Sequence, residues 1–188
     1  MFYAAVILIS DLLILALNYF LRGGGLPALG QAALASFGGT VIVIAVDGLF
    51  AFLLRRLPGK WFAPGARLFR VGKKERTFLG KLGVKRWKNL VPELGCFTGF
   101  HKDRLGDPRD GERLGRFLLE SNYGVVIHLE NALCGLFLPL FPFLRPFSVW
   151  FPIFFVNFVL HLLPVAILRY NTPPLRLLYK RSGGEVKD

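Results

Sequence analysis

The sequence has few of the residues that mark disulfide frameworks, metal sites and the common hydrolase or nucleotide-binding motifs. Its two cysteines, Cys96 and Cys134, are far apart and form no CxxC pair, so neither a disulfide framework nor a zinc site is indicated. Its three histidines lack HExxH or paired spacing, so we expect no bound metal and no cofactor. No serine lies in a GxSxG turn, and no glycine-rich phosphate loop is present. Any chemistry must therefore rest on other side chains.

Acidic residues are also scarce: the chain has 12, against 24 lysines and arginines, for a formal net charge of +12. This excess could indicate a nucleic-acid partner, but the basic residues flank apolar runs, which favours a positive face against anionic membrane lipid. Hydrophobic residues make up 53% of the 188 residues and charged residues only 19%. The mean hydropathy of +0.47 agrees with this segregation. The sequence thus predicts an all-α integral membrane protein with no nucleic-acid partner.

Four apolar runs are predicted to cross the membrane. They are residues 1–21, 31–54, 123–141 and 149–168. About 20 apolar residues in a helix cover the roughly 30 Å hydrocarbon core. The first run has no charged n-region and no small-residue cleavage site, so we interpret it as a retained span and not as a signal peptide. We therefore expect a single membrane domain over residues 1–188 with about four transmembrane helices.

The polar segment between the second and third spans, residues 55–122, is strongly basic. It holds 17 of the 24 lysines and arginines, interleaved with Trp, Phe and Leu, which is typical of amphipathic interfacial helices with snorkelling basic side chains. The tail, residues 169–188, adds five basic residues, whereas the opposite loops carry only Arg22 and Arg145. The positive-inside rule then places this segment, the tail and both termini in the cytoplasm of a cell-membrane protein.

Polar and small residues gather on one face of the third predicted span. At 100° per residue, an arc of about 80° contains Glu120, Gly124, His128, Asn131 and Gly135. Such a stripe on an apolar helix is expected to face protein or water. For His128, a structural role as a core histidine bonded to a carbonyl and a functional role are equally open. Glu130 lies off the stripe, and we expect either a basic interhelical partner or a role as a reactant.

Three predicted spans carry polar groups at a similar depth. Asp47 lies in the second span, His128 and Asn131 lie in the third, and His161 lies in the fourth, one turn from Asn157. At about 1.5 Å per residue, these groups are on the order of 7–17 Å below the cytoplasmic boundary. The shared depth predicts a cavity that opens to the cytoplasmic leaflet.

Four short motifs occur in a set order along the chain. They are RLPGKWF at 56–62, VKRWKNLVPELG at 84–95, a glutamate (Glu120) eight residues before His128, and RYNTPP at 169–174. In order and spacing they resemble the glycosyl-4,4'-diaponeurosporenoate acyltransferase family of small bacterial membrane proteins, over roughly residues 56–180. The resemblance implies an enzyme that esterifies a sugar hydroxyl of a glycosylated C30 carotenoid acid, or of a related glycolipid, with a fatty acyl chain.

The resemblance and the polar groups together lead to a hypothesis for the site. His128 is the candidate general base for the acceptor hydroxyl, and Glu120 or Asn131 would orient the imidazole or polarise the donor carbonyl. Direct transfer is expected over an acyl-enzyme, because neither cysteine has an evident activating base. The residues expected to bind donor or acceptor are Arg86, Trp87, Lys88, Pro92, Glu93, Asn157, His161, Arg169, Tyr170 and Asn171.

The partners expected are therefore membrane lipid, an acyl donor such as acyl-CoA, and a glycosylated lipid or carotenoid acceptor. Arg86, Lys88 and Arg169 would hold the donor's phosphate or the developing oxyanion, and Asn171 would add a hydrogen bond. The alternative is a non-catalytic membrane protein that binds lipid or pigment and assists a biosynthetic complex. In that case the polar stripe would serve helix packing alone.

Overall fold

The structure is a computed structural model that describes residues 2–91, 107 and 109–185. The chain divides into two compact units. Unit 1 combines Met1–Leu53 with Leu129–Leu162, and unit 2 combines Leu54–His128 with Leu163–Asp188. Each unit is described separately below.

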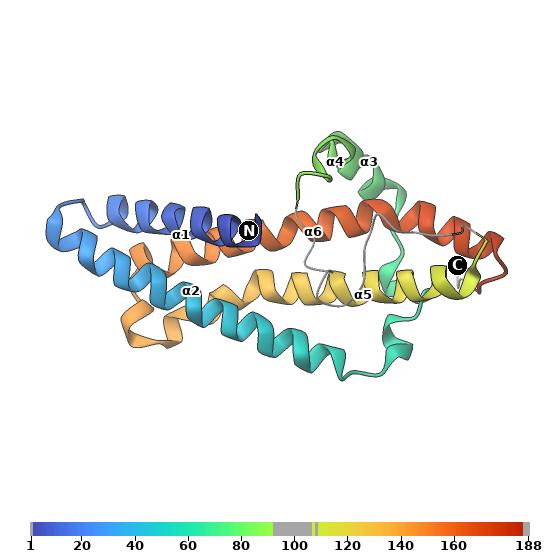
Figure 1. Cartoon of the computed structure of the whole chain (residues 1–188), viewed down its shortest axis with the longest axis horizontal. Coiled ribbons are helices and arrows are strands. Elements are labelled where there is room, and N and C mark those ends of the chain that lie inside the picture. The colour runs from blue at the N-terminus through green and yellow to red at the C-terminus, as the bar shows by residue number, and fades with distance from the viewer. Residues whose placement is uncertain (1, 92–106, 108, 186–188) are drawn as a thin grey trace. The chain divides into compact units, whose positions relative to one another are not determined.

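The described residues form helices and no strand, which confirms the predicted all-α class. The α-helices, shown in Figure 1, are α1 (Phe2–Leu21), α2 (Leu26–Arg55), α3 (Lys73–Lys81), α4 (Val84–Trp87), α5 (Gly111–Cys134) and α6 (Phe147–Arg181). Short 3-10 helices cover Gly59–Phe62, Arg67–Phe69, Gly135–Leu140 and Pro142–Leu144. The short helices between α2 and α5 agree with the expectation for residues 55–122.

Among the described residues, three helical stretches are long and apolar enough to cross a membrane: Ala28–Arg55, Gly111–Leu140 and Phe147–Arg181. At most 39% of the residues in each of their most apolar windows are buried within the protein, and large apolar side chains such as Leu34, Phe37 and Phe155 are exposed. Exposure on this scale is what a lipid environment requires, and the protein is an integral membrane protein. The apolar part of α1, Ala5–Leu21, is shorter, so a fourth span remains a prediction.

The long helices extend beyond the runs expected to cross the membrane. α5 begins at Gly111, twelve residues before the predicted span, just after Asp110, whose Oδ1 accepts a hydrogen bond from the backbone N–H of Arg113 at 2.9 Å. α6 continues past residue 168 to Arg181. The apolar run shows which part of a helix can contact lipid, but the helix itself ends where its backbone groups are capped. The ends of the apolar run and the ends of the helix therefore differ.

In unit 1, α1 and α2 form a hairpin with a glycine turn. Gly24 and Gly25 adopt φ values of 73° and 97°, in the left-handed region that glycine enters without strain. Along the hairpin, Asn18 donates to Ser36 Oγ at 3.3 Å, and the Thr40 hydroxyl donates to Asp11 at 2.9 Å. Asp11 and Asn18 on α1 therefore serve as contacts between the two helices.

In unit 2, the residues after α2 dock on the N-terminal half of α5. Asn122 Nδ2 donates to the Phe62 carbonyl at 3.0 Å, and the Tyr123 hydroxyl donates to the Leu57 carbonyl at 2.9 Å. The rings of Phe62 and Tyr123 stack with centroids 3.8 Å apart. Arg55 and Glu120 form an ion pair at 2.7 Å. The first of the sequence motifs, residues 56–62, is thus a segment that packs on α5.

Also in unit 2, α3 and α4 lie against the C-terminal half of α6 (Figure 1), where Leu79, Val84 and Ile167 share a buried cluster. Arg169 on α6 makes two hydrogen bonds of 2.7 Å to the carboxylate of Glu75 on α3. A bidentate guanidinium–carboxylate pair restrains both position and orientation, so it fixes which face of α3 turns outward.

Candidate active site

A cluster of a carboxylate, an imidazole and a thiol lies within unit 1. Asp47 on α2 uses both carboxylate oxygens: Oδ1 accepts a hydrogen bond from Cys134 Sγ at 2.9 Å, and Oδ2 lies 3.0 Å from His161 Nε2. The side chains of Asp47 and His161 are each only 15% exposed. Asp47 and His161, which the sequence places at a similar level of their helices, are thus in direct contact.

Helical spacing explains why these groups meet. Glu130 and Cys134 are four residues apart on α5, and Asn157 and His161 are four apart on α6, so each pair lies on one helix face. Asn157 Nδ2 donates to the Asn131 carbonyl at 2.7 Å and lies 3.6 Å from Cys134 Sγ. These contacts between α5 and α6 bring the Cys134 thiol and the His161 imidazole to the same carboxylate.

A glycine allows α5 and α6 to approach closely beside the cluster. A Cβ atom placed on Gly135 would lie 3.0 Å from the Phe154 Cα, closer than nearly all such contacts in proteins. A larger residue at position 135 would separate the helices at the level of Cys134. Gly135 therefore belongs to the packing that sets the geometry of the cluster.

Glu130 adds a second carboxylate at the edge of the cluster. The charged groups that act on it are Asp47 and His161, and its Oε2 is buried and accepts no hydrogen bond from the described residues. The basic interhelical partner that we considered for Glu130 is thus replaced by an imidazole and another acid. A carboxylate oxygen with an open acceptor position is available to a substrate hydroxyl or to a proton.

His128, the predicted base, points in a different direction from this cluster. At 100° per residue its side chain leaves α5 about 160° from that of Glu130 and about 120° from that of Cys134. Its side chain is half-buried. The imidazole of His161, a predicted substrate-binding residue, contacts the Asp47 carboxylate.

The polar stripe faces protein, as predicted, and packs largely against α6. Gly124 lies opposite Leu168, whose Cδ1 would be 3.0 Å from an added Cβ. Asn131 is buried, and its side-chain Oδ1 accepts no hydrogen bond within the described part of the chain. Glu120, the third residue of the predicted catalytic set, is engaged by Arg55. The catalytic roles of Glu120, His128 and Asn131 remain predictions.

Three of the residues predicted to bind substrate in unit 2 contact one another: Lys88, Tyr170 and Asn171. Lys88 Nζ donates to Asn171 Oδ1 at 3.3 Å and lies 5.9 Å from the Tyr170 ring centroid, so two of the sequence motifs meet here. Trp87 Nε1 donates to the Leu82 carbonyl at 3.0 Å, and Arg86 is exposed. Pro92 and Glu93, also predicted to bind substrate, lie outside the described residues.

Arg169, predicted to hold an anion, has two structural partners. Besides its pair with Glu75, it donates to the Arg70 carbonyl at 3.2 Å. These contacts secure α3 on α6, and anion binding by Arg169 remains a prediction. The structure also holds no group of three or more His, Cys, Asp or Glu side chains placed to ligate a metal, among the residues it describes.

The part of the cluster that sequence reasoning missed is the face of α5 that carries Glu130 and Cys134. The sequence feature that could have indicated this face is the spacing of Glu130 and Cys134, four residues apart on an apolar helix and outside the polar stripe. Neither residue was expected to contact Asp47. Cys134 donates a hydrogen bond to the Asp47 carboxylate, and the absence of an activating base at either cysteine stays a prediction.

The chain was compared with protein families, with curated proteins and with solved structures. No curated protein and no solved structure matches the chain. The model of the family described as glycosyl-4,4'-diaponeurosporenoate acyltransferase matches residues 58–181, which is well over half of the sequence and nearly the extent of the resemblance noted above. The match includes His161, Cys134 and Glu130 but leaves out Asp47. The chain belongs to the glycosyl-4,4'-diaponeurosporenoate acyltransferase family.

Proposed function

We propose that the protein transfers a fatty acyl group from an activated donor to a sugar hydroxyl of a glycosylated C30 carotenoid acid, at the cytoplasmic leaflet. Family membership supports the reaction class and the kind of acceptor. The apolar helices can place the protein in the membrane, where a long carotenoid and an acyl chain dissolve. The observation that carries the mechanism is the 3.0 Å contact between His161 Nε2 and Asp47.

In this mechanism His161 is the general base. If its Nε2–H donates to Asp47, the neutral imidazole has its lone pair on Nδ1, where it takes the proton of the acceptor hydroxyl. The hydroxyl oxygen forms the new ester bond to the acyl carbon, and the bond from that carbon to the donor's leaving group breaks. The imidazolium, stabilised by Asp47, then returns the proton to the leaving group. Asp47 orients the ring and compensates its transient charge.

The surroundings of Cys134 favour direct transfer over an acyl-enzyme. Nucleophilic thiolates in proteins are stabilised by cations or helix N-termini. Cys134 instead donates to the Asp47 carboxylate at 2.9 Å, and a thiolate beside a carboxylate would be destabilised by like-charge repulsion. We therefore expect Cys134→Ser to keep most of its acyl transfer, whereas a covalent route would lose it.

The test compares His161 with His128, the base expected from the stripe. Purified His161→Ala and His128→Ala would be reconstituted with a glycosylated C30 carotenoid and a fatty acyl thioester, and the ester product measured by mass spectrometry. We expect His161→Ala to lower the rate on the order of 10²- to 10⁴-fold, the usual contribution of a general base. The reverse order of effects would assign the base to His128, and little effect of either would exclude both.

A specific observation also favours the non-catalytic alternative. The stripe residues Gly124, Asn131 and Gly135 pack within the protein, as expected for residues that serve only helix packing. Lipid extracts separate the two functions. The acyltransferase adds one ester-linked fatty acid to the carotenoid glycoside in cells that make the protein, and the binding protein leaves the composition unchanged.

A further inference from the structure

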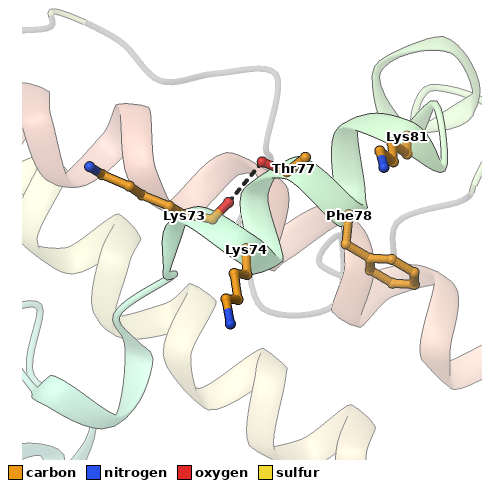
Figure 2. Close-up of a pocket in the computed structure, with 5 residues that line it drawn as sticks. All are labelled: Lys73, Lys74, Thr77, Phe78 and Lys81. Carbon is orange, nitrogen blue, oxygen red and sulfur yellow. Dashed lines mark hydrogen bonds between the residues drawn. The ribbon is translucent and has the colours of Figure 1, made fainter.

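The outward face of α3 carries a group of lysines around an exposed aromatic ring. A shallow depression on this face is lined by Lys73, Lys74, Thr77, Phe78 and Lys81. Figure 2 shows Lys74 and Phe78 extending from successive turns toward the same side, with Lys73 and Lys81 near the two ends of the helix. All five side chains are exposed, Phe78 by 60%. We name these five residues the α3 lysine face.

The helix period accounts for the division between this face and the one that packs on α6. Taking Lys73 as zero and 100° per residue, the five residues fall within an arc of about 140°. Glu75 and Leu79, which contact α6, fall near 200° and 240°, on the opposite side. The pair with Arg169 and the burial of Leu79 therefore hold α3 with its lysines turned outward.

The position of α3 along the chain gives a second indication. Its anchor, Arg169, comes directly after residue 168, where the fourth predicted span ends. A helix held at this point of α6 lies at the level of lipid headgroups, where lysine ammonium groups meet phosphates and an aromatic ring reaches the acyl boundary. The exposed ring of Phe78 among lysines matches this boundary.

We infer that the α3 lysine face binds the anionic headgroups of phospholipids in the cytoplasmic leaflet. Three ammonium groups complement the lipid phosphates, and Phe78 inserts between the first acyl segments. Anionic lipid would thus hold unit 2 against the membrane surface. This inference does not depend on which histidine acts as the base, nor on catalysis.

The experiment uses the full chain in nanodiscs of phosphatidylcholine, with or without phosphatidylglycerol, and follows amide hydrogen exchange in residues 73–81. Phosphatidylglycerol should slow exchange there on the order of tenfold, and high salt should remove the effect, because headgroup attraction to lysine is screened. A variant with Lys73→Gln, Lys74→Gln and Lys81→Gln should lose the lipid dependence. A matched variant with Lys60→Gln, Arg116→Gln and Lys180→Gln removes the same charge elsewhere and should retain it.

Three outcomes would overturn the inference. Equal exchange in both lipids would show that the face does not distinguish anionic headgroups. Equal loss of the lipid effect in both triple variants would make it a property of net charge and not of this face. Protection by inorganic phosphate or coenzyme A alone, in phosphatidylcholine, would make the face a site for a soluble phosphate compound.

Discussion

Replacing Asp47 by asparagine tests the proposed role of the Asp47–His161 pair most directly. The amide has the size and shape of the carboxylate, so the packing of α2 is conserved, but it removes the charge that stabilises an imidazolium. A hydrogen bond to a charged group contributes about 1.5–3 kcal/mol. Since about 1.4 kcal/mol corresponds to a factor of ten in rate, we expect acyl transfer to fall about 10- to 150-fold. His161→Ala should cost more, because it removes the base itself.

The chain offers a matched control for this variant. Asp11 is the other aspartate within the apolar helices of unit 1, and it too accepts a hydrogen bond, at 2.9 Å from the Thr40 hydroxyl. Asp11→Asn makes the same chemical change in the hairpin of α1 and α2, away from His161. We expect its activity to remain within about threefold of wild type, because the charge that it removes does not act on the base.

The assay is single-turnover acylation of a glycosylated carotenoid in proteoliposomes, with thermal stability measured on the same preparations. A selective loss of rate in Asp47→Asn, at similar stability in both variants, supports the mechanism. Full activity of Asp47→Asn would refute this mechanism, because it would show that His161 does not require the negative charge of Asp47. Equal loss in both variants would show instead that intramembrane carboxylates sustain folding.

Three further predictions concern contacts within the two units. Glu75→Gln should weaken the pair with Arg169 and speed hydrogen exchange in α3 several-fold, since an exposed or half-exposed ion pair is worth up to about 1 kcal/mol. Gly135→Ala should lower the thermal stability by about 1–3 kcal/mol of overpacking, whereas Gly48→Ala, which meets no atom within 4 Å, should not. Asn122→Ala should cost about 1–3 kcal/mol in chemical denaturation, because it leaves the buried Phe62 carbonyl and the partly buried Ala63 carbonyl without their donor.

Much of the fold follows from the sequence because lipid imposes simple rules. Runs of about 20 apolar residues must be helices in a membrane, since no water is present to satisfy the backbone. The predicted spans accordingly lie within α1, α2, α5 with its 3-10 extension, and α6. The helix ends were not predictable in this way. α5 begins at Gly111 and α6 ends at Arg181, both in polar segments where hydropathy carries no information.

The site was predicted only in part, for a geometric reason. Depth along a helix follows from residue counting, and it correctly grouped Asp47 with His161. Which face of α5 meets α2 depends on the packing of three helices, which residue counting does not determine. The stripe that contains His128 was the more conspicuous face, whereas the face with Glu130 and Cys134 is the one that contacts Asp47 or feels its charge. Pairing between distant segments, such as Lys88 with Asn171, was equally inaccessible.

The position of Asp47 on α2 affects which part of the chain is needed for activity. The family match starts at residue 58, so a fragment trimmed to that boundary would contain all three histidines and both cysteines yet lack the carboxylate. In the proposed mechanism such a fragment would bind its ligands but turn over slowly. Co-expressed with residues 1–57 as a separate hairpin, it should regain activity through noncovalent assembly in the bilayer. The part of the chain needed for activity would then be larger than the part that matches the family.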